Sequence, residues 1–264
     1  MSALAIGCCA GAPDLALIDR TPGLDFIELP VAQTLMGSTE DFEHLVAQLQ
    51  RSTLIARAAN VFLPATLKVV GPEARPDQLS AYASSALERA CRLGISLLVF
   101  GSGASRFVPT GFSHEHALEQ FEDAVRIVGE QASARGVTLA VEPLHSAETN
   151  LLNSVGEAAA FLRQRSLDGV RLVADLWHME CEGEELAALD DLGDVIAHAH
   201  VAAAERRAPG QATDRIEEFL MRLRHAGFGG VCSIECRWLD LPAELPAAVA
   251  RVRHAATAAG WSAT

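Results

Sequence analysis

The sequence lacks the features that mark nucleic-acid-binding and membrane-spanning proteins. Basic residues are scarce, since 21 Lys and Arg stand against 34 Asp and Glu and give a net charge of −13. Because an acidic surface repels phosphate backbones, we expect no nucleic-acid partner. No stretch approaches ~18 apolar residues without a charge, so we expect no membrane span. The opening residues MSALAIGCCAGAPD have no basic start and are interpreted as a first strand, not as a signal peptide.

The six cysteines form no CxxC pair. Cys8 and Cys9 are adjacent, so their side chains are predicted to point to opposite faces of a strand. In a chain of 264 residues such cysteines are typical of reduced, mostly buried thiols, which predicts a cytoplasmic protein.

Linkers and low-complexity tracts are also missing, which predicts a single domain over residues 1–264. Short apolar runs rich in Val, Ile and Leu alternate with longer amphipathic stretches. The expected strands are residues 3–9, 24–29, 59–63, 95–100, 137–142, 170–175, 195–201 and 231–236. The expected helices are a short one near 13–20 and those at 41–59, 80–94, 113–136, 154–165, 183–193, 213–227 and 241–260.

Eight strands that each precede a helix predict a parallel α/β fold. In 264 residues, eight such units predict a closed (β/α)8 TIM barrel. A dinucleotide-binding fold is the rival interpretation. It would need a Gly-rich turn after the first strand, and GCCAGAPD is a poor match to G-x-G-x-x-G.

Several predicted strands end on polar residues that a buried strand does not favour: Glu28, Glu142, Asp175, His200 and Glu235. In a barrel the carboxyl ends of all strands open on one face, where active sites lie, so these side chains are expected to converge. A single acid at such a position is more often a helix cap, as Asp175 by itself could be. His198 and His200 are two apart and share one strand face, and one of them could be a core histidine.

Converging carboxylates would raise each other's pKa, and a divalent cation removes that conflict. Three carboxylates and one imidazole favour Mn²⁺, with Mg²⁺, Co²⁺ or Zn²⁺ as alternatives. The cysteines are not arranged to bind a metal ion.

The second half of the chain carries four ordered motifs: EPL after residue 141, D-x-x-H at 175–178, HAHVAAAER at 198–206 and IE at 234–235. Over residues 95–236 the sequence resembles the xylose isomerase-like TIM barrels of the sugar phosphate isomerase/epimerase superfamily. The D-tagatose (D-psicose, or allulose) 3-epimerase branch is the most similar.

This resemblance implies a set of roles. Glu142, Asp175, His200 and Glu235 would hold the metal ion, and Glu142 and Glu235 would also exchange protons with the substrate. Glu148, His178 and Arg206 would bind the substrate. The implied activity is that of a metal-dependent isomerase or epimerase, acting on a ketose or related α-hydroxy ketone by proton transfer through a cis-enediolate. The implied partner is a small sugar, and a homodimer or homotetramer is possible.

The sequence also departs from the epimerase pattern. HVAAAERR lacks the G-E-x-x-R form, so the motif does not identify which sugar is the substrate. Gly101 and Gly103 with Arg106 could cradle a phosphate, although a tight turn is the simpler interpretation. Trp177 is predicted to be a core residue, and the alternative is that it forms an apolar wall under the sugar. The alternative functions are hydroxypyruvate isomerase, inosose dehydratase, an endonuclease IV-like repair enzyme and a non-catalytic sugar-binding barrel.

Overall fold

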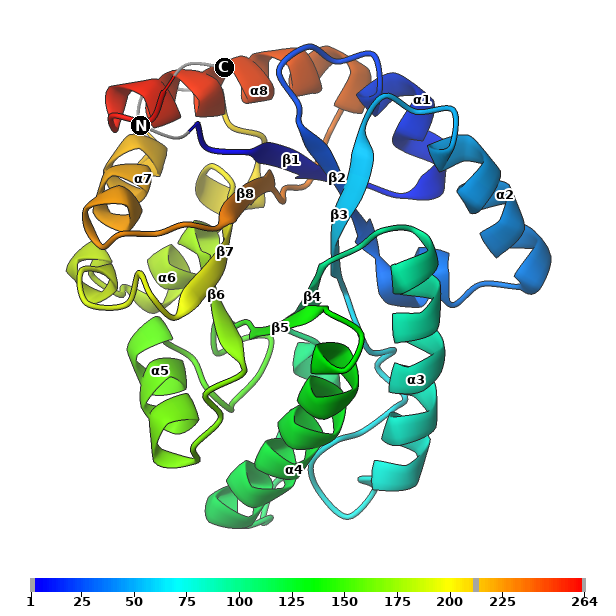
Figure 1. Cartoon of the computed structure of the whole chain (residues 1–264). Helices are drawn as coiled ribbons and strands as arrows, with labels where there is room; N and C mark the ends of the chain where they lie inside the picture. Colours follow the sequence, from blue (N-terminus) through cyan, green and yellow to red (C-terminus); the bar gives the residue numbers. More distant parts are fainter. Residues whose placement is uncertain (1–2, 211–213, 263–264) are drawn as a thin grey trace.

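The computed structural model describes residues 3–210 and 214–262. Its strands close a parallel barrel in chain order, which confirms the predicted fold (Figure 1). The strands are β1 (Ile6–Cys9), β2 (Phe26–Pro30), β3 (Ile55–Asn60), β4 (Leu97–Phe100), β5 (Thr138–Val141), β6 (Arg171–Asp175), β7 (Ile196–Val201) and β8 (Val231–Ile234).

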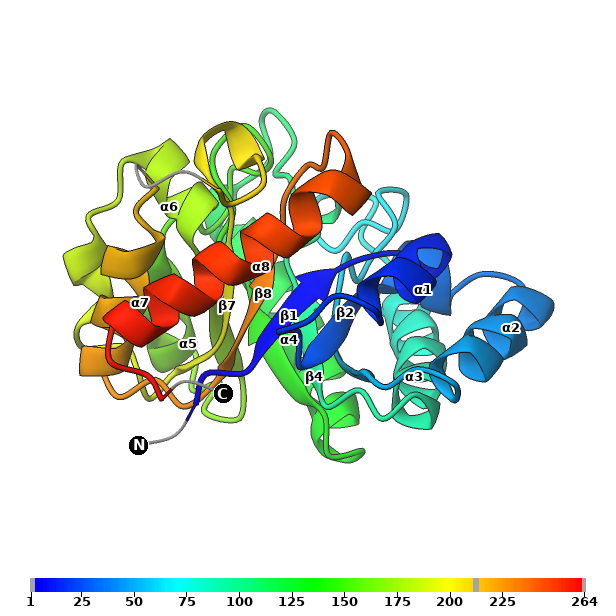
Figure 2. The same ribbon diagram turned by 90° about the horizontal axis from the view of Figure 1, so that it is seen from above.

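Helices surround the barrel, and α8 packs along β1 (Figure 2). The α-helices are α1 (Leu15–Ile18), α2 (Thr39–Leu49), α3 (Pro76–Arg92), α4 (His114–Ser133), α5 (Val155–Gln164), α6 (Leu176–Glu182), α7 (Ile216–His225) and α8 (Leu241–Ala258). Shorter helical turns are η1 (Ala12–Asp14), η2 (Val31–Leu35), η3 (Gly103–Ser105), η4 (Leu186–Leu189) and η5 (Ala204–Arg206). None of the helices among the described residues is long and apolar enough to cross a membrane.

The third strand lies earlier in the chain than the sequence pattern predicts. The predicted helix 41–59 ends at Leu49, and β3 begins at Ile55. The turn between them is held by the Asp19 carboxylate, which accepts hydrogen bonds from the Ser52 hydroxyl and the Thr53 amide. The apolar spacing of this stretch hides that turn.

The helix predicted at 183–193 is also wrong, because only η4 forms there. The helix that follows β6 is α6, which starts directly after Asp175 and ends at Gly183. The helix predicted at 80–94 begins earlier, at Pro76. Thr213, the first residue of the helix predicted at 213–227, lies outside the described residues.

Alternation along the strands explains where the polar residues lie. Phe26, Ala58, Ala140 and Val173 belong to the small apolar cluster formed by inward-facing positions of the strands. Since side chains two apart share a strand face, the residues two positions later also face inward at the open carboxyl end: Glu28, Asn60, Glu142 and Asp175. This open end is called the mouth below.

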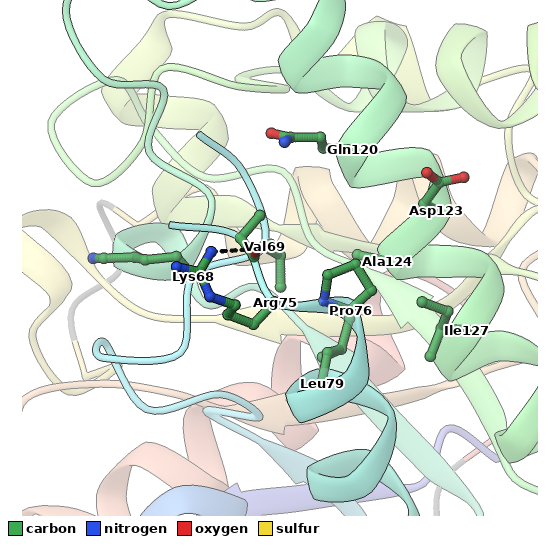
Figure 3. Close-up of a pocket in the computed structure, with 10 residues that line it drawn as sticks. Lys68, Val69, Arg75, Pro76, Leu79, Gln120, Asp123, Ala124 and Ile127 are labelled. Atoms are coloured by element: carbon green, nitrogen blue, oxygen red, sulfur yellow. Dashed lines mark hydrogen bonds between the residues drawn. The ribbon is translucent and has the colours of Figure 1, made fainter. Parts of the chain in front are cut away.

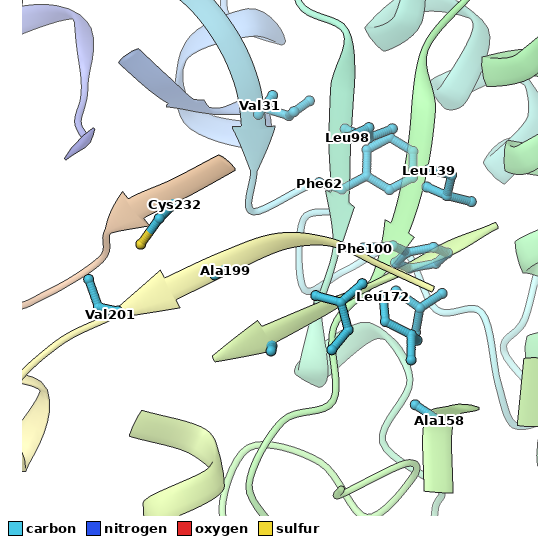
Figure 4. Close-up of a cluster of buried hydrophobic side chains, with 14 of the residues drawn as sticks. Val31, Phe62, Leu98, Phe100, Leu139, Ala158, Leu172, Ala199, Val201 and Cys232 are labelled. Atoms are coloured by element: carbon cyan, nitrogen blue, oxygen red, sulfur yellow. The ribbon is translucent and has the colours of Figure 1, made fainter. Parts of the chain in front are cut away.

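The opposite face of each strand packs against the helices. Leu98, Phe100, Leu139 and Leu172 lie in this larger core, together with Phe62, which follows β3 (Figure 4). All six cysteines are free, as predicted, although Cys91 and Cys181 are exposed.

Candidate functional site

The mouth brings together the four residues predicted to hold a metal ion. One ligand atom each of Glu142, Asp175, His200 and Glu235 lies within 4.8 Å of the others. His200 Nδ1 is 2.9 Å from Glu142 Oε1, 3.1 Å from Glu235 Oε2 and 3.7 Å from Asp175 Oδ2. The four residues stand at the ends of β5, β6, β7 and β8, as parallel strands in a barrel require.

Asp175 uses its two carboxylate oxygens for different tasks. Oδ1 caps α6 by accepting hydrogen bonds from the amides of Trp177 and His178, at 2.7 Å and 3.2 Å. Oδ2 is buried, faces His200 and has no hydrogen-bond partner among the described residues. Both interpretations of Asp175 from the sequence therefore hold for the geometry: it is a helix cap, and it is also a member of the cluster.

The electrostatics of this cluster are those of crowded carboxylates. Burial, followed by repulsion from Glu142 and Glu235, raises the pKa of Asp175 to about 8. Burial also raises the pKa of Glu142. Burial alone would raise the pKa of Glu235 too, but His200 and Arg206 bring it down to about 2. Like charges held this close are costly unless a cation lies among them.

The donor set fits a divalent cation. Three carboxylates and one imidazole converge, and within residues 3–210 and 214–262 the buried Asp175 Oδ2 has no hydrogen-bond partner. Oxygen donors with one nitrogen suit Mn²⁺, Mg²⁺ or Zn²⁺, and the geometry alone does not select among them.

The ring nitrogen of His200 that faces away from the cluster contacts the carboxylate of Glu28. The sequence identified Glu28 as a polar strand end but assigned it no role. Glu28, fully buried at the end of β2, lies 3.1 Å from His200 Nε2 and 2.7 Å from His198 Nε2. The pKa of Glu28 is well below its usual value, because the attraction of His198 and His200 overcomes the effect of burial. A carboxylate on the far nitrogen of a metal-binding histidine orients its ring.

His198 is held by contacts at both ring nitrogens. Its Nδ1 lies 2.9 Å from the Val231 carbonyl oxygen, and its Nε2 faces the Glu28 carboxylate. The ring is therefore held between two oxygen atoms, one on each side. The structure thus places His198 in buried contact with Glu28, whose other oxygen contacts His200.

His178 presents a hydrogen-bond donor to the mouth. Its Nδ1 accepts a hydrogen bond from the backbone amide of His145 at 3.1 Å, so a neutral ring carries its proton on Nε2. Burial and then Arg206 lower the pKa of His178 to about 2, which keeps the ring neutral. Nε2 is buried and has no hydrogen-bond partner among the described residues. His145, which the sequence did not single out, fixes this tautomer.

Arg206 and Glu148 complete the set predicted from the sequence. The Arg206 guanidinium is 2.8 Å from Glu235 Oε2 and 3.4 Å from Glu148 Oε1. It also lies over the Trp177 ring, at 4.7 Å from the ring centroid. Trp177 is only partly buried and lies outside the hydrophobic core, so its assignment to the core is wrong.

Asn60 is a member of the site that the sequence did not reveal. Its side-chain amide donates to Glu235 Oε1 at 2.9 Å. The error in the bounds of the third strand hid it, since Asn60 is the last residue of β3 and would have stood out as a polar strand end.

The loop after β4 is packed against the site and does not present Arg106 to it. Arg106 is fully buried, donates to the Glu142 carbonyl oxygen and lies over the Phe121 ring. A Cβ on Gly103 would lie 2.6 Å from the Glu148 carbonyl oxygen. The glycines therefore allow a close approach of two loops, and the interpretation of Arg106 as part of a phosphate cradle is wrong.

A cavity of about 370 Å³ opens at the mouth. Its lining includes Gln33, Asn60, Ser102, Glu142, Glu148, His178, Arg206 and Glu235. A smaller cavity of about 80 Å³ lies apart from this site, between the loop before α3 and α4 (Figure 3). The polar side chains that line it do not form a cluster like that of the mouth, so the mouth is the candidate site.

Several curated proteins match part of the chain. The 3-dehydro-D-guloside 4-epimerase of Escherichia coli K12 is 29% identical over 44% of this chain and 44% of its own length. The D-psicose 3-epimerase of Agrobacterium fabrum is 25% identical over 43% of this chain and 39% of its own length. The matched segment thus spans less than half the length of these relatives.

The fold is similar to a solved structure along nearly the whole chain. The D-psicose 3-epimerase from Clostridium cellulolyticum H10, solved with D-tagatose, superposes with a TM-score of 0.82 over 96% of this chain and 99% of that protein. Its sequence identity of 20% supports the fold alone. The family model described as xylose isomerase-like TIM barrel matches residues 17–257. The chain therefore belongs to the xylose isomerase-like TIM barrel family.

Proposed function

We propose that this protein is a divalent-metal-dependent sugar epimerase or isomerase that acts on an α-hydroxy ketone. The observation that carries the proposal is the convergence of ligand atoms of Glu142, Asp175, His200 and Glu235 within 4.8 Å of one another. Two of the four, Glu142 and Glu235, line an open cavity. The curated relatives support the class, because both are named as sugar epimerases.

The four residues would hold the cation, whose contribution when bound is to polarise the substrate carbonyl as a Lewis acid. The other residues bind and orient the sugar. Arg206 and the Nε2–H of His178 are donors that face the cavity, and Glu148 is an acceptor for a hydroxyl group. Glu28 and His198 keep the His200 ring in place.

Glu142 and Glu235 are the proposed proton carriers. Their carboxylate oxygens lie 2.9 Å and 3.1 Å from His200 Nδ1, and both residues line the cavity. One carboxylate removes the proton from the carbon next to the carbonyl, and the other returns a proton from the opposite face. Return to the same carbon gives an epimer. Return to the former carbonyl carbon gives an aldose–ketose isomer, in which the proton of the neighbouring hydroxyl group also passes to the former carbonyl oxygen. Neither path needs an oxidant or a second substrate.

Three further features belong to the same proposal. Mn²⁺ is the expected ion, the chain forms one domain over residues 1–264, and a homodimer or homotetramer is its expected assembly. The predicted cytoplasmic location stays a prediction.

Deuterium exchange tests the proposal. The Mn²⁺-loaded protein is incubated in deuterated water with D-psicose, D-tagatose, hydroxypyruvate and an inosose, and the position of deuterium is read by NMR. Deuterium at a carbon next to the carbonyl of a ketose supports an epimerase. Exchange only into hydroxypyruvate supports the isomerase alternative, and loss of water from the inosose supports the dehydratase.

Glu235→Gln is the matched variant for this assay. It keeps the size of the side chain and removes the carboxylate, so exchange should fall to background. Glu217→Gln, on the exposed face of α7, is the control and should exchange at the parent rate. An active Glu235→Gln protein would remove Glu235 from the proposed mechanism.

A further inference from the structure

We propose that the mouth continues into a second binding site that holds the non-reacting ring of a glycosidic keto sugar, such as a keto disaccharide. This inference rests on the proposed function and narrows its substrate class. It concerns a cavity of about 580 Å³ beside the mouth, called the outer cavity, which is lined by Lys68, Val70, Pro72, Glu73, Phe107 and Pro109.

The outer cavity and the mouth share two lining residues. Ala104 and Glu148 line both of them, so a molecule bound at the mouth can extend past these side chains without crossing the protein core. Two side-chain contacts connect Glu148 with the proposed reaction centre. Glu148 is 3.4 Å from Arg206, and Arg206 is 2.8 Å from Glu235. A substituent that extends from the reacting sugar past Glu148 would therefore enter the outer cavity.

The walls of the outer cavity suit the face of a ring. Phe107 is 47% exposed, which is unusual for a large aromatic side chain beside an open cavity. Val70, Pro72 and Pro109 extend this apolar surface. The C–H face of a pyranose ring is flat and apolar, so burying it against an aromatic ring gains free energy by removing both surfaces from water.

The charged groups at its rim favour hydroxyls over phosphate. Lys68 is the only lysine of the chain, and its ammonium already donates to the Ala104 carbonyl oxygen at 2.9 Å. Its side chain points away from Asp123 and Ile127, which line the cavity between the loop before α3 and α4 (Figure 3). Two carboxylates, Glu73 and Glu148, share the outer cavity with it. A phosphate dianion would meet more negative than positive charge there, whereas sugar hydroxyls can bond to both kinds of group.

A ring in the outer cavity has a consequence for the reacting sugar. In a glycoside the anomeric carbon is part of an acetal and cannot form a free carbonyl group. The carbonyl must therefore be at another ring carbon, and the sugar stays cyclic. Proton removal next to that ketone and proton return from the opposite face then change one stereocentre. Only a C–H bond is broken and remade, and the glycosidic bond stays intact.

Substrate comparison tests this inference. The Mn²⁺-loaded protein is assayed by deuterium exchange with D-psicose, D-psicose 6-phosphate and the 3-keto derivatives of methyl glucoside, phenyl glucoside and cellobiose. We expect kcat/KM for 3-keto cellobiose to exceed that for the methyl derivative by about tenfold, a typical value for burying one ring against an aromatic side chain. In Phe107→Ala that advantage should disappear, while the methyl derivative is turned over as in the parent protein.

Met221→Ala is the matched control, because Met221 is an apolar side chain on α7 that is 38% exposed. It should keep the preference for 3-keto cellobiose. The oligomeric state of each variant is measured by light scattering, since an exposed aromatic residue can also belong to an interface between subunits.

Four results would overturn the inference. The first is an equal kcat/KM for the methyl and cellobiose derivatives in the parent protein. The second is a higher kcat/KM for D-psicose 6-phosphate, and the third is a higher kcat/KM for the phenyl derivative alone. The fourth is an equal loss of kcat/KM for all substrates in Phe107→Ala together with a change in oligomeric state. In each of these cases exchange into at least one keto sugar leaves the proposed function standing. If no keto sugar exchanges at all, the proposed function fails and the inference fails with it.

Discussion

The Glu142 carboxylate occupies the space that a side chain at Gly101 would fill. A Cβ on Gly101 would lie 2.3 Å from Glu142 Oε2, well inside van der Waals contact. The end of β4 and the end of β5 are neighbours in the barrel, so the residue after one strand limits the position of the acid on the other. The identity of a turn residue is thereby linked to the geometry of the proposed metal site.

Gly101→Ala should therefore weaken metal binding more than it weakens the fold. The added methyl group displaces the end of a flexible side chain, which costs the fold little. We expect the affinity for Mn²⁺ to fall roughly 10- to 100-fold, as is typical when the surroundings of a ligand are disturbed. Isothermal titration calorimetry measures the affinity, and thermal unfolding measures the stability.

Gly103→Ala should show the opposite pattern. Its Cβ would lie 2.6 Å from the Glu148 carbonyl oxygen, and a backbone atom cannot move aside as easily as a carboxylate. We expect a loss of about 1–3 kcal/mol in the free energy of unfolding. Gly156→Ala, at an open position in α5, is the control for both variants. Equal effects of Gly101→Ala and Gly103→Ala on metal affinity would contradict this distinction.

Glu28→Gln should lower metal affinity although Glu28 is not one of the four predicted ligands. Its two oxygens accept hydrogen bonds from His198 Nε2 and His200 Nε2, and a glutamine would turn an N–H group toward one of these donors. We expect the affinity for Co²⁺ to fall roughly 10- to 100-fold, with a changed visible spectrum of the bound ion. Glu217→Gln serves as the control, and an unchanged Co²⁺ spectrum and affinity in Glu28→Gln would rule out the positioning role.

Asp175→Asn separates the cap of α6 from the metal site. Asparagine is as good a helix cap as aspartate, so the variant should unfold at a temperature close to that of the parent in the presence of a chelator. Mn²⁺ at 100 times its Kd should stabilise the parent by about 2.7 kcal/mol and the variant far less. Asp168→Asn, at an exposed loop position, should respond to Mn²⁺ like the parent. The same Mn²⁺ stabilisation in Asp175→Asn as in the parent would show that Asp175 is no ligand.

Asn60→Ala should slow deuterium exchange without abolishing it. The variant loses the hydrogen bond from the Asn60 amide to Glu235 Oε1, while Arg206 and His200 still hold Oε2. A hydrogen bond to a charged group is worth about 1.5–3 kcal/mol, which corresponds to a loss of about 10- to 100-fold in rate. Parent-like exchange rates over the whole pH range would show that Asn60 has no part in orienting Glu235.

The sequence predicts the barrel and its four proposed ligands for one physical reason. Strands that are buried on both faces read as apolar runs, so an acid at the end of a run stands out, as Glu142 and Asp175 do. The carboxyl ends of such strands meet at one mouth whatever their separation along the chain. Both facts are local in sequence or follow from topology, and neither requires knowledge of side-chain contacts.

The surroundings of the site depend on contacts that no local pattern reports. Asn60 was hidden because the turn before β3 is held by Asp19, a residue from another part of the chain. The role of Glu28 depends on His198 and His200, and the tautomer of His178 depends on a backbone amide at His145. Arg106 looked available to a phosphate, yet it is buried beneath Glu142.

The central claim is that one divalent cation binds among Glu142, Asp175, His200 and Glu235. The most direct test is an anomalous difference map from a crystal of the protein soaked in Mn²⁺. The account predicts one strong peak about 2.0–2.6 Å from a donor atom of each of the four side chains. A map with no peak at the mouth, or with its main peak outside this cluster, would contradict the claim.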